Sequence, residues 1–241
     1  MGTGIAEIAA LETSFETRTM QVGETEIVAD RTGALYVPCE GTLIVADLHL
    51  EKGSSYAARG IFLPPYDTLD TLQRLDKVIR RFRPRRVIAL GDSFHDRRAA
   101  DRLGTEALAI LRRQQRGREW VWITGNHDPD IRPAIGGHVH DHIALGRLVL
   151  HHEPVPGPVD GEIAGHLHPA ARVAIGGAGL RRPCFVASQT RLVLPAFGSF
   201  TGGLNVLDPA FEPLFDGDNF DVHVLGQAGV YPIARSSLTV D

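Results

Sequence analysis

Cysteine is scarce in this chain, which has only Cys39 and Cys184 among 241 residues. The two do not form a Cys-x-x-Cys pair, so the sequence supports neither a disulfide framework nor a thiolate metal site. Long hydrophobic runs are also missing, because stretches such as 86–91 are far shorter than the roughly 20 residues that cross a bilayer. The N-terminus shows no basic segment followed by an apolar one. We therefore expect a soluble, cytoplasmic protein that is not associated with a membrane.

A net charge of −4 argues against a protein that coats nucleic acid, but this average hides an asymmetry. Residues 80–118 contain 12 arginines and 4 acidic residues (+8), so the rest of the chain contains 13 basic and 25 acidic residues (−12). Runs of arginine at 80–86 and 112–118 can bind phosphates, or can complement the negative C-terminal ends of helices. The sequence favours the second interpretation and leaves the first open.

Strand-like and helical stretches alternate from residue 25, in the order β, β, β, α, β, α, β, which predicts parallel strands in a βαβ unit. Residues 66–82 have apolar side chains at the i, i+3, i+4 spacing of a helix packed on a sheet. After Pro129 the chain changes to short strands separated by Gly and Pro. We expect one α/β domain over 25–208, preceded by an arm at 1–24 and followed by a tail at 209–241 that packs on it.

Five polar clusters each follow an apolar strand. They are Asp47-Leu48-His49, Gly91-Asp92, Gly125-Asn126-His127-Asp128, His151-His152 and Gly165-His166-Leu167-His168. In an open α/β sheet the carboxyl ends of the strands meet at one edge, so we expect these clusters to converge there. Carboxylates, one amide and several imidazoles suit divalent ions such as manganese, iron or zinc. The set is larger than one ion needs, which indicates a dinuclear site.

Asp92 is the candidate for the carboxylate that bridges two ions, because Gly91 lets the backbone turn sharply at the strand end. We expect Asp47 and His49 to share one side of an extended segment, and His166 and His168 to do the same. Asn126 adds a neutral oxygen ligand.

In this order, the motifs D-x-H, G-D, G-N-H-D, a single His and G-H-x-H resemble those of the calcineurin-like metallophosphoesterases. The resemblance covers about residues 42–205 and implies an αββα sandwich of two sheets flanked by helices. It implies that one metal is held by Asp47, His49, Asp92 and His168, and the other by Asp92, Asn126, His151 and His166. It also implies that His127 stabilises the phosphate or protonates the leaving oxygen, and that hydroxide activated by the two ions attacks phosphorus.

One departure from the phosphatase pattern G-D-x-x-D lies in GDSFHD, where His95 replaces the last Asp, the residue that orients the catalytic imidazole in that branch. Asp96 or Asp128 is then the candidate partner of His127. The segments ADLHLEKGSSYAARG, LPPYDT, GDSFHD and LPAFGSFTGG resemble the bacterial ligase-associated DNA damage response endonucleases, a branch encoded beside a DNA ligase and a helicase. That resemblance implies cleavage of DNA with Mn²⁺ and possible ligase and helicase partners.

Several residues admit two interpretations. His151 and His152 compete for one role because adjacent strand residues face opposite ways, and we choose His151 by its motif position. Because His138, His140 and His142 alternate, we expect them on one face of a strand, where they could bind an extra metal; the sequence favours ordinary exposed or hydrogen-bonded strand histidines, since nothing nearby completes a site. Lys52 and Arg59 are candidate contacts for substrate, or belong to a solvated loop. Two other functions stay open, namely hydrolysis of nucleotides or small phosphate esters and a non-catalytic partner of a DNA ligase or helicase.

Overall fold

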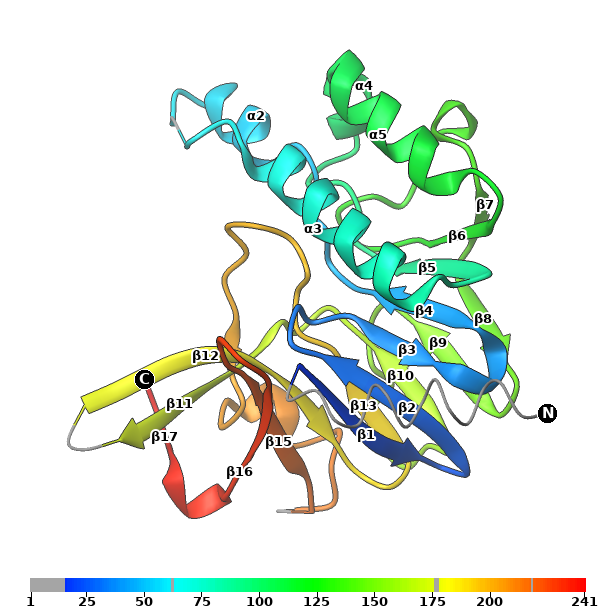
Figure 1. Ribbon diagram of the computed structural model, residues 1–241. Helices are drawn as coiled ribbons and strands as arrows, with labels where there is room; N and C mark the ends of the chain where they lie inside the picture. The colour runs from blue at the N-terminus through cyan, green and yellow to red at the C-terminus, as the bar shows by residue number, and fades with distance from the viewer. Residues whose placement is uncertain (1–15, 62, 176–177, 218) are drawn as a thin grey trace.

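The computed structural model describes residues 16–61, 63–175, 178–217 and 219–241. Two β-sheets stack face to face, and helices cover the outer face of the first sheet (Figure 1). Within these described ranges, the first sheet has seven strands in chain order, antiparallel from β1 to β4 and parallel from β4 to β7. They are β1 (Thr17–Val22), β2 (Thr25–Asp30), β3 (Leu35–Val37), β4 (Thr42–Val45), β5 (Arg86–Leu90), β6 (Glu119–Ile123) and β7 (His138–His140).

The helical layer consists of α2 (Lys52–Ala57), α3 (Asp67–Phe82), α4 (Ala99–Arg102) and α5 (Thr105–Gln115). Helix α3 buries Leu72, Leu75 and Val78 against the first sheet, as its apolar spacing predicts. Residues 99–115 form two helices rather than one, because the backbone leaves the helical conformation at Leu103 and Gly104.

Over the residues that the structure describes, the second sheet contains ten strands. They are β8 (His142–Leu145), β9 (Leu148–His151), β10 (Glu162–Ala164), β11 (Pro169–Ile175), β12 (Ala178–Ala187), β13 (Arg191–Val193), β14 (Leu204–Asn205), β15 (Asp221–Leu225), β16 (Val230–Ile233) and β17 (Leu238–Thr239). Short 3₁₀ helices complete the chain at η1 (Pro38–Glu40), η2 (Pro133–Ile135), η3 (Pro209–Phe211) and η4 (Arg235–Ser237). Among the described residues, the outer face of this sheet packs against Val206, Phe211 and Phe215 rather than against an α-helix.

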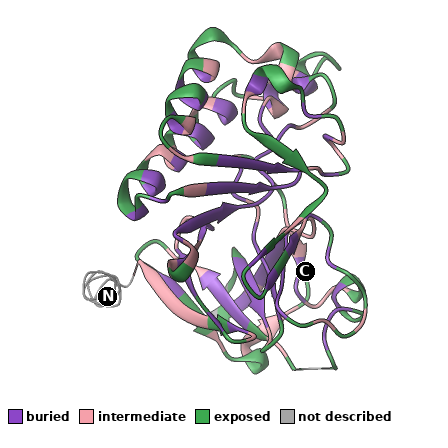
Figure 2. Ribbon diagram, turned by 90° about the vertical axis from the view of Figure 1, so that its right-hand side faces the viewer, coloured by how far each residue is buried: buried purple, intermediate pink, exposed green. Residues whose placement is uncertain are grey.

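The core between the sheets holds the site in place. Ile44, Ile88 and Val121 of the first sheet pack in one buried cluster with Leu150 and other side chains of the second sheet. Strands β4, β5 and β6 are mostly buried, and hence purple in Figure 2. Burying each such side chain stabilises the fold by about 1.5–3 kcal/mol. The strands that carry the polar clusters are therefore fixed relative to one another where they end.

The two-sheet α/β sandwich predicted from the sequence is confirmed. One detail was wrong: His138, His140 and His142 do not share a strand, because β7 and β8 belong to different sheets. Most of the predicted arm, residues 1–15, lies outside the described residues, and β1 begins at Thr17. Within the described part of the chain, no helix is long and apolar enough to cross a membrane.

Candidate metal centre

The polar clusters that follow β4, β5, β6, β9 and β10 meet at the carboxyl edge of the first sheet. The structure brings together Asp47, His49, Asp92, Asn126, His127, His166 and His168 as predicted, together with His95 and His152. Those nine residues come from five separate segments of the chain. Packing of the two sheets, rather than any local motif, creates the site.

The first ligand group consists of Asp47, His49 and His168, whose ligand atoms all lie within 4.8 Å of one another. His168 Nε2 is 3.3 Å from His49 Nε2 and 3.2 Å from Asp47 Oδ1. Asp47 is fully buried and His49 is nearly so. One carboxylate and two imidazole nitrogens therefore point at a common position.

The second ligand group consists of Asn126, His152 and His166. Asn126 Oδ1 is 3.1 Å from both His152 Nε2 and His166 Nδ1, and these two nitrogens are 3.2 Å apart. The three atoms form a nearly equilateral triangle. Asp92 Oδ2 lies 3.3 Å from His152 Nε2, so this carboxylate adjoins the triangle.

These spacings fit divalent metal ions. Ligands at about 2.0–2.2 Å from one ion, at angles between octahedral and tetrahedral, are about 2.8–3.6 Å apart from each other. The 3.1–3.3 Å separations within both groups fall in that range. Asp92 Oδ2 is 4.0 Å from His49 Nε2, just outside that range, so the Asp92 carboxylate belongs with the second group and lies next to the first. The residues present therefore suit divalent ions at two neighbouring positions on either side of Asp92.

His152 occupies the position for which the sequence analysis chose His151, and that choice was wrong. His151 Nε2 instead hydrogen-bonds Glu162 Oε1 at 2.7 Å, away from both ligand groups. His152 Nδ1 donates to the backbone carbonyl of Leu90 at 3.2 Å, so its Nε2 is left free to bind metal. The alternation of β9 explains this placement, because His152 continues the buried face of Leu148 and Leu150.

Unusual backbone geometry is concentrated at the ligands. Of the eight non-glycine residues with positive φ in the described chain, five belong to this site: Asp47, His49, Asp92, His166 and His168. Such conformations cost about 1–3 kcal/mol each when the surrounding structure enforces them. The segments expected to be extended are therefore bent, and backbone hydrogen bonds from Asp47 to Gly91 (3.2 Å) and from His49 to Asp92 (2.9 Å) hold the first bend.

Two motif glycines are required because ligands of other motifs pass close to them. A Cβ at Gly91 would lie 2.1 Å from His152 Nδ1, and one at Gly125 would lie 2.2 Å from Asp92 Oδ1. Gly91 also has a φ of +76°, which side chains disfavour. Both glycines thus make room for ligands as well as shaping turns.

Electrostatics keep the Asp92 carboxylate ionised. Burial opposes its ionisation, but the hydrogen bond and the charge of His152 outweigh burial and lower the pKa of Asp92 to about 2. Burial likewise opposes protonation of His152, yet Asp92 and Asp47 raise the pKa of His152 to about 9. Burial, with the nearby His168, lowers the pKa of His49, which favours the neutral imidazole that metals bind.

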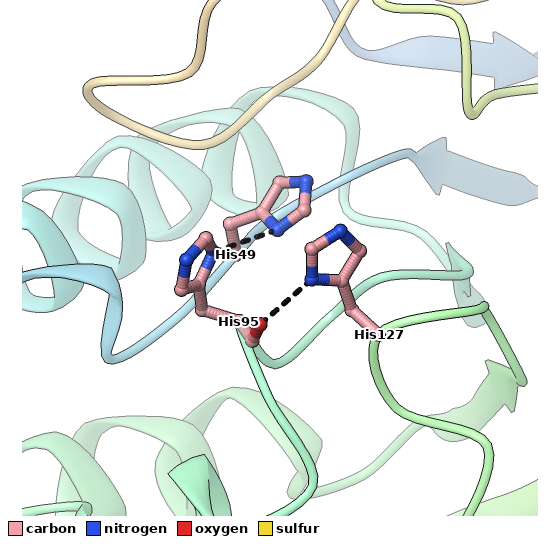
Figure 3. A group of neighbouring side chains, drawn as sticks. All are labelled: His49, His95 and His127. Atoms are coloured by element: carbon pink, nitrogen blue, oxygen red, sulfur yellow. Dashed lines mark hydrogen bonds between the residues drawn. The ribbon is translucent and has the colours of Figure 1, made fainter. Parts of the chain in front are cut away.

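His127 lies beside the first ligand group without belonging to it. Its Nδ1 donates to the backbone carbonyl of His95 at 2.8 Å (Figure 3). Its Nε2 lies 3.9 Å from Asp92 Oδ2. Neither predicted partner holds this ring, because Asp96 binds Arg102 at 2.6 Å and Asp128 accepts from backbone N–H groups. The backbone carbonyl of His95 therefore orients His127, and His95 is the residue that stands at the position of the phosphatase Asp.

His95 itself is a member of the site that the sequence marked only as a departure. Its Nδ1 lies 3.3 Å from His49 Nδ1, the ring nitrogen of His49 that faces away from the first ligand group (Figure 3). His49, His95 and His127 form a third cluster that could hold an ion. Burial, followed by the charge of Lys52, lowers the pKa of His95 to about 4.

The predicted substrate contacts have different positions at the rim. Lys52 Nζ donates to the backbone carbonyl of Phe200 at 3.0 Å, and burial lowers the pKa of Lys52. Arg59 is exposed just after α2 and lies close enough to influence the charge of His95. Among the described residues, His138, His140 and His142 are exposed and take part in no group that could hold a metal.

Comparison with known proteins assigns the family. The family model of the calcineurin-like phosphoesterases matches residues 42–156, which contain Asp47 through His152. The crystal structure of Pseudomonas putida nuclease MPE is 30% identical with a TM-score of 0.70, and the match covers 90% of this chain and 100% of that one. The chain belongs to the calcineurin-like phosphoesterases.

Other matches to this calcineurin-like phosphoesterase are more distant. A phosphoesterase from E. coli, Yfce, is 14% identical with a TM-score of 0.40, over 80% of this chain and 98% of that one. A protein of unknown function from Aquifex aeolicus is 18% identical with a TM-score of 0.37, over 53% and 78%. No curated protein shows a significant sequence match.

Proposed function

We propose that this phosphoesterase is a metal-dependent nuclease that hydrolyses phosphodiester bonds in DNA through two divalent ions. The observation that carries the proposal is the position of Asp92 between two ligand groups, with His127 Nε2 3.9 Å from the same carboxylate. The 30% identity to Pseudomonas putida nuclease MPE supports a nuclease in particular.

Each ligand group would hold one of the two ions. Asp47, His49 and His168 would hold one ion, Asn126, His152 and His166 the other, and Asp92 both. When bound, the ions neutralise phosphate charge and acidify the attacking water. The mixed nitrogen and oxygen set suits manganese, iron or zinc, and we propose Mn²⁺ as the activating ion.

His127 is placed to handle the leaving oxygen. Because its Nδ1 donates to the His95 carbonyl, the proton on that nitrogen is fixed and Nε2 faces the site. A protonated Nε2 can donate to the phosphate or transfer its proton to the ester oxygen that departs. His127 is 39% exposed in its side chain, so a substrate can reach it directly.

The experiment that tests this function uses metal-stripped protein with Mn²⁺ added back. We expect hydrolysis of both a generic phosphodiester and supercoiled plasmid DNA, with both activities dependent on the added ion. Turnover of neither substrate would reject the proposal, and cleavage of small diesters without DNA binding at low salt would assign a nucleotide or small-ester substrate instead. A cytoplasmic role in DNA repair beside a ligase or helicase stays a prediction from the sequence resemblance.

A further inference from the structure

Two arginine runs that are far apart in the sequence lie side by side in the fold. Residues 80–86 end α3 and begin β5, and residues 112–118 end α5 and precede β6. The backbone N–H of Glu119 donates to the carbonyl of Arg85 at 2.9 Å, and Arg86 pairs with Glu119 in the β5–β6 register. Both helices end on the same side of the first sheet (Figure 1). Arg80, Arg83, Arg85, Arg112, Arg113 and Arg116 are exposed there, and we call these six the arginine surface.

Most of this charge is not neutralised within the described chain. Residues 76–86 and 112–119 contain ten Lys or Arg and two acidic residues, a balance of +8. Both acids are already engaged, since Asp76 lies 2.8 Å from Arg80 and 3.7 Å from Arg113, and Glu119 pairs with Arg86. Glu16 and Asp30 pair with Arg81, which leaves about +6.

The helix dipoles do not neutralise the remaining positive charge of the arginine surface. The C-terminal end of a helix carries roughly half a negative charge, so α3 and α5 together offset about one unit. Within the described residues, no carboxylate lies within ion-pair distance of Arg83, Arg85, Arg112 or Arg116. Complementing the helix ends therefore explains only a small part of this surface.

The arginine surface lies at the opposite edge of the sheet from the metal centre. Strands β5 and β6 are each five residues long and run from the arginine surface to the ligands, so the two regions are about 17 Å apart along the strands. A phosphate held by the ligand groups is out of reach of these guanidinium groups. At about 3.4 Å per nucleotide step, the separation corresponds to about five steps along a nucleic acid strand.

The surface lacks what a protein partner would need at its centre. Protein interfaces bury apolar and aromatic anchors within a polar rim. The exposed large hydrophobic side chains of the described chain all lie elsewhere, and none falls within 76–86 or 112–119. Forked guanidinium groups without apolar anchors match a regularly spaced row of phosphates instead.

We propose that the arginine surface is a second nucleic-acid contact, which binds the phosphate backbone about five nucleotide steps or more from the bond that is cleaved. The identity of the polymer rests on the proposed function, but binding at this surface requires neither metal nor catalysis. Because phosphate contacts carry no sequence information, the surface would increase affinity for long DNA at any sequence.

The test compares DNA binding by two matched triple variants in EDTA, so that the metal centre does not contribute. The first carries Arg83→Gln, Arg112→Gln and Arg116→Gln. The control carries Arg147→Gln, Arg172→Gln and Arg235→Gln, which remove the same charge from other parts of the fold. Fluorescence anisotropy with a duplex of about 20 base pairs is measured over a range of salt concentrations.

We expect the first variant to bind about tenfold or more weakly at low salt, with its log–log salt slope reduced by about two to three, since each lost contact removes about 0.9. The control should stay within about twofold of the wild type. Mn²⁺-dependent hydrolysis of a small diester should be unchanged in both, and each single substitution should reduce the salt slope by about one.

Equal binding by the two triple variants would overturn the proposal, as would binding of polyglutamate as tightly as DNA. The two proposals fail separately. DNA cleavage without this binding difference would reject the arginine surface alone, whereas arginine-dependent binding without any cleavage would reject the nuclease alone.

Discussion

The two ligand groups lie on either side of Asp92 but differ in charge. The first has a carboxylate of its own, the fully buried Asp47, whereas Asn126, His152 and His166 supply only neutral ligand atoms when they bind metal. Coulomb attraction to a divalent ion is strong in a buried site, so one additional carboxylate matters. We infer that the first group holds its ion more tightly and that the second exchanges its ion more readily.

Backbone conformation separates the groups as well. Asp47, His49 and His168 all have positive φ, while in the second group only His166 does. The surrounding hydrogen bonds therefore shape the first group more strongly before any ion arrives. We therefore expect one tight, preorganised metal position beside a second position that exchanges its ion more readily.

Removing the shared carboxylate should have the largest effect. Asp92→Asn keeps the side-chain volume but removes the charge that both ions need, so we expect both to be lost and activity to fall by about 10³-fold or more. Metal content by mass spectrometry and diester hydrolysis measure the two effects. Asp96→Asn is the control, because Asp96 pairs with Arg102 outside both groups. Retention of one tightly bound ion by Asp92→Asn would contradict the shared role.

Replacing His127 should separate catalysis from metal binding. His127→Ala removes the ring beside Asp92 without removing a member of either ligand group, so we expect about 10²-fold or greater loss of activity with two ions retained. Wild-type turnover by this variant would show that the assigned role is wrong. His140→Ala, which changes an exposed histidine of β7, should behave as wild type.

The adjacent histidines at the end of β9, His151 and His152, provide a test of the second group alone. His152→Ala should weaken the second ion at least tenfold and leave the first in place, because only one ligand of the triangle is lost. His151→Ala should retain both ions and lower the free energy of unfolding by about 1 kcal/mol, since Glu162 loses one hydrogen bond. Calorimetric metal titration and urea unfolding measure these outcomes. If the His151→Ala variant loses an ion instead, His151 rather than His152 is the metal ligand.

The smallest expected effect is the difference in affinity within the unaltered protein. Titration of metal-stripped protein with Mn²⁺ should show two binding steps about tenfold or more apart, which is about 1.4 kcal/mol. Asn126→Asp adds a carboxylate to the second group and should reduce the difference between the two Mn²⁺ affinities. Two binding steps of equal affinity in the wild type would contradict the inferred difference between the two ligand groups.

Much of the site could be predicted because its residue types are unusual and their order is informative. Asp47, His49, Asp92, Asn126, His166 and His168 converge as expected, since each follows a buried strand. Their backbone shapes could not be predicted, because nothing in Asp-Leu-His signals a positive φ at non-glycine residues.

The position of His152 could also have been predicted from the sequence, whereas the partner of His127 and the meeting of the arginine runs could not. The alternation of buried Leu148 and Leu150 places His152 on the inner face, and this pattern was visible in the sequence. The partner of His127 is a backbone carbonyl, which residue identity does not reveal. The meeting of the two arginine runs depends on the register of β5 and β6, which only the folded chain fixes.

Anomalous diffraction from crystals soaked in Mn²⁺ tests the central claim most directly. Two peaks roughly 3.5–4 Å apart are predicted, with Asp92 contacting both, Asp47, His49 and His168 at one, and Asn126, His152 and His166 at the other. A single peak, or two peaks that do not share Asp92, would contradict the account.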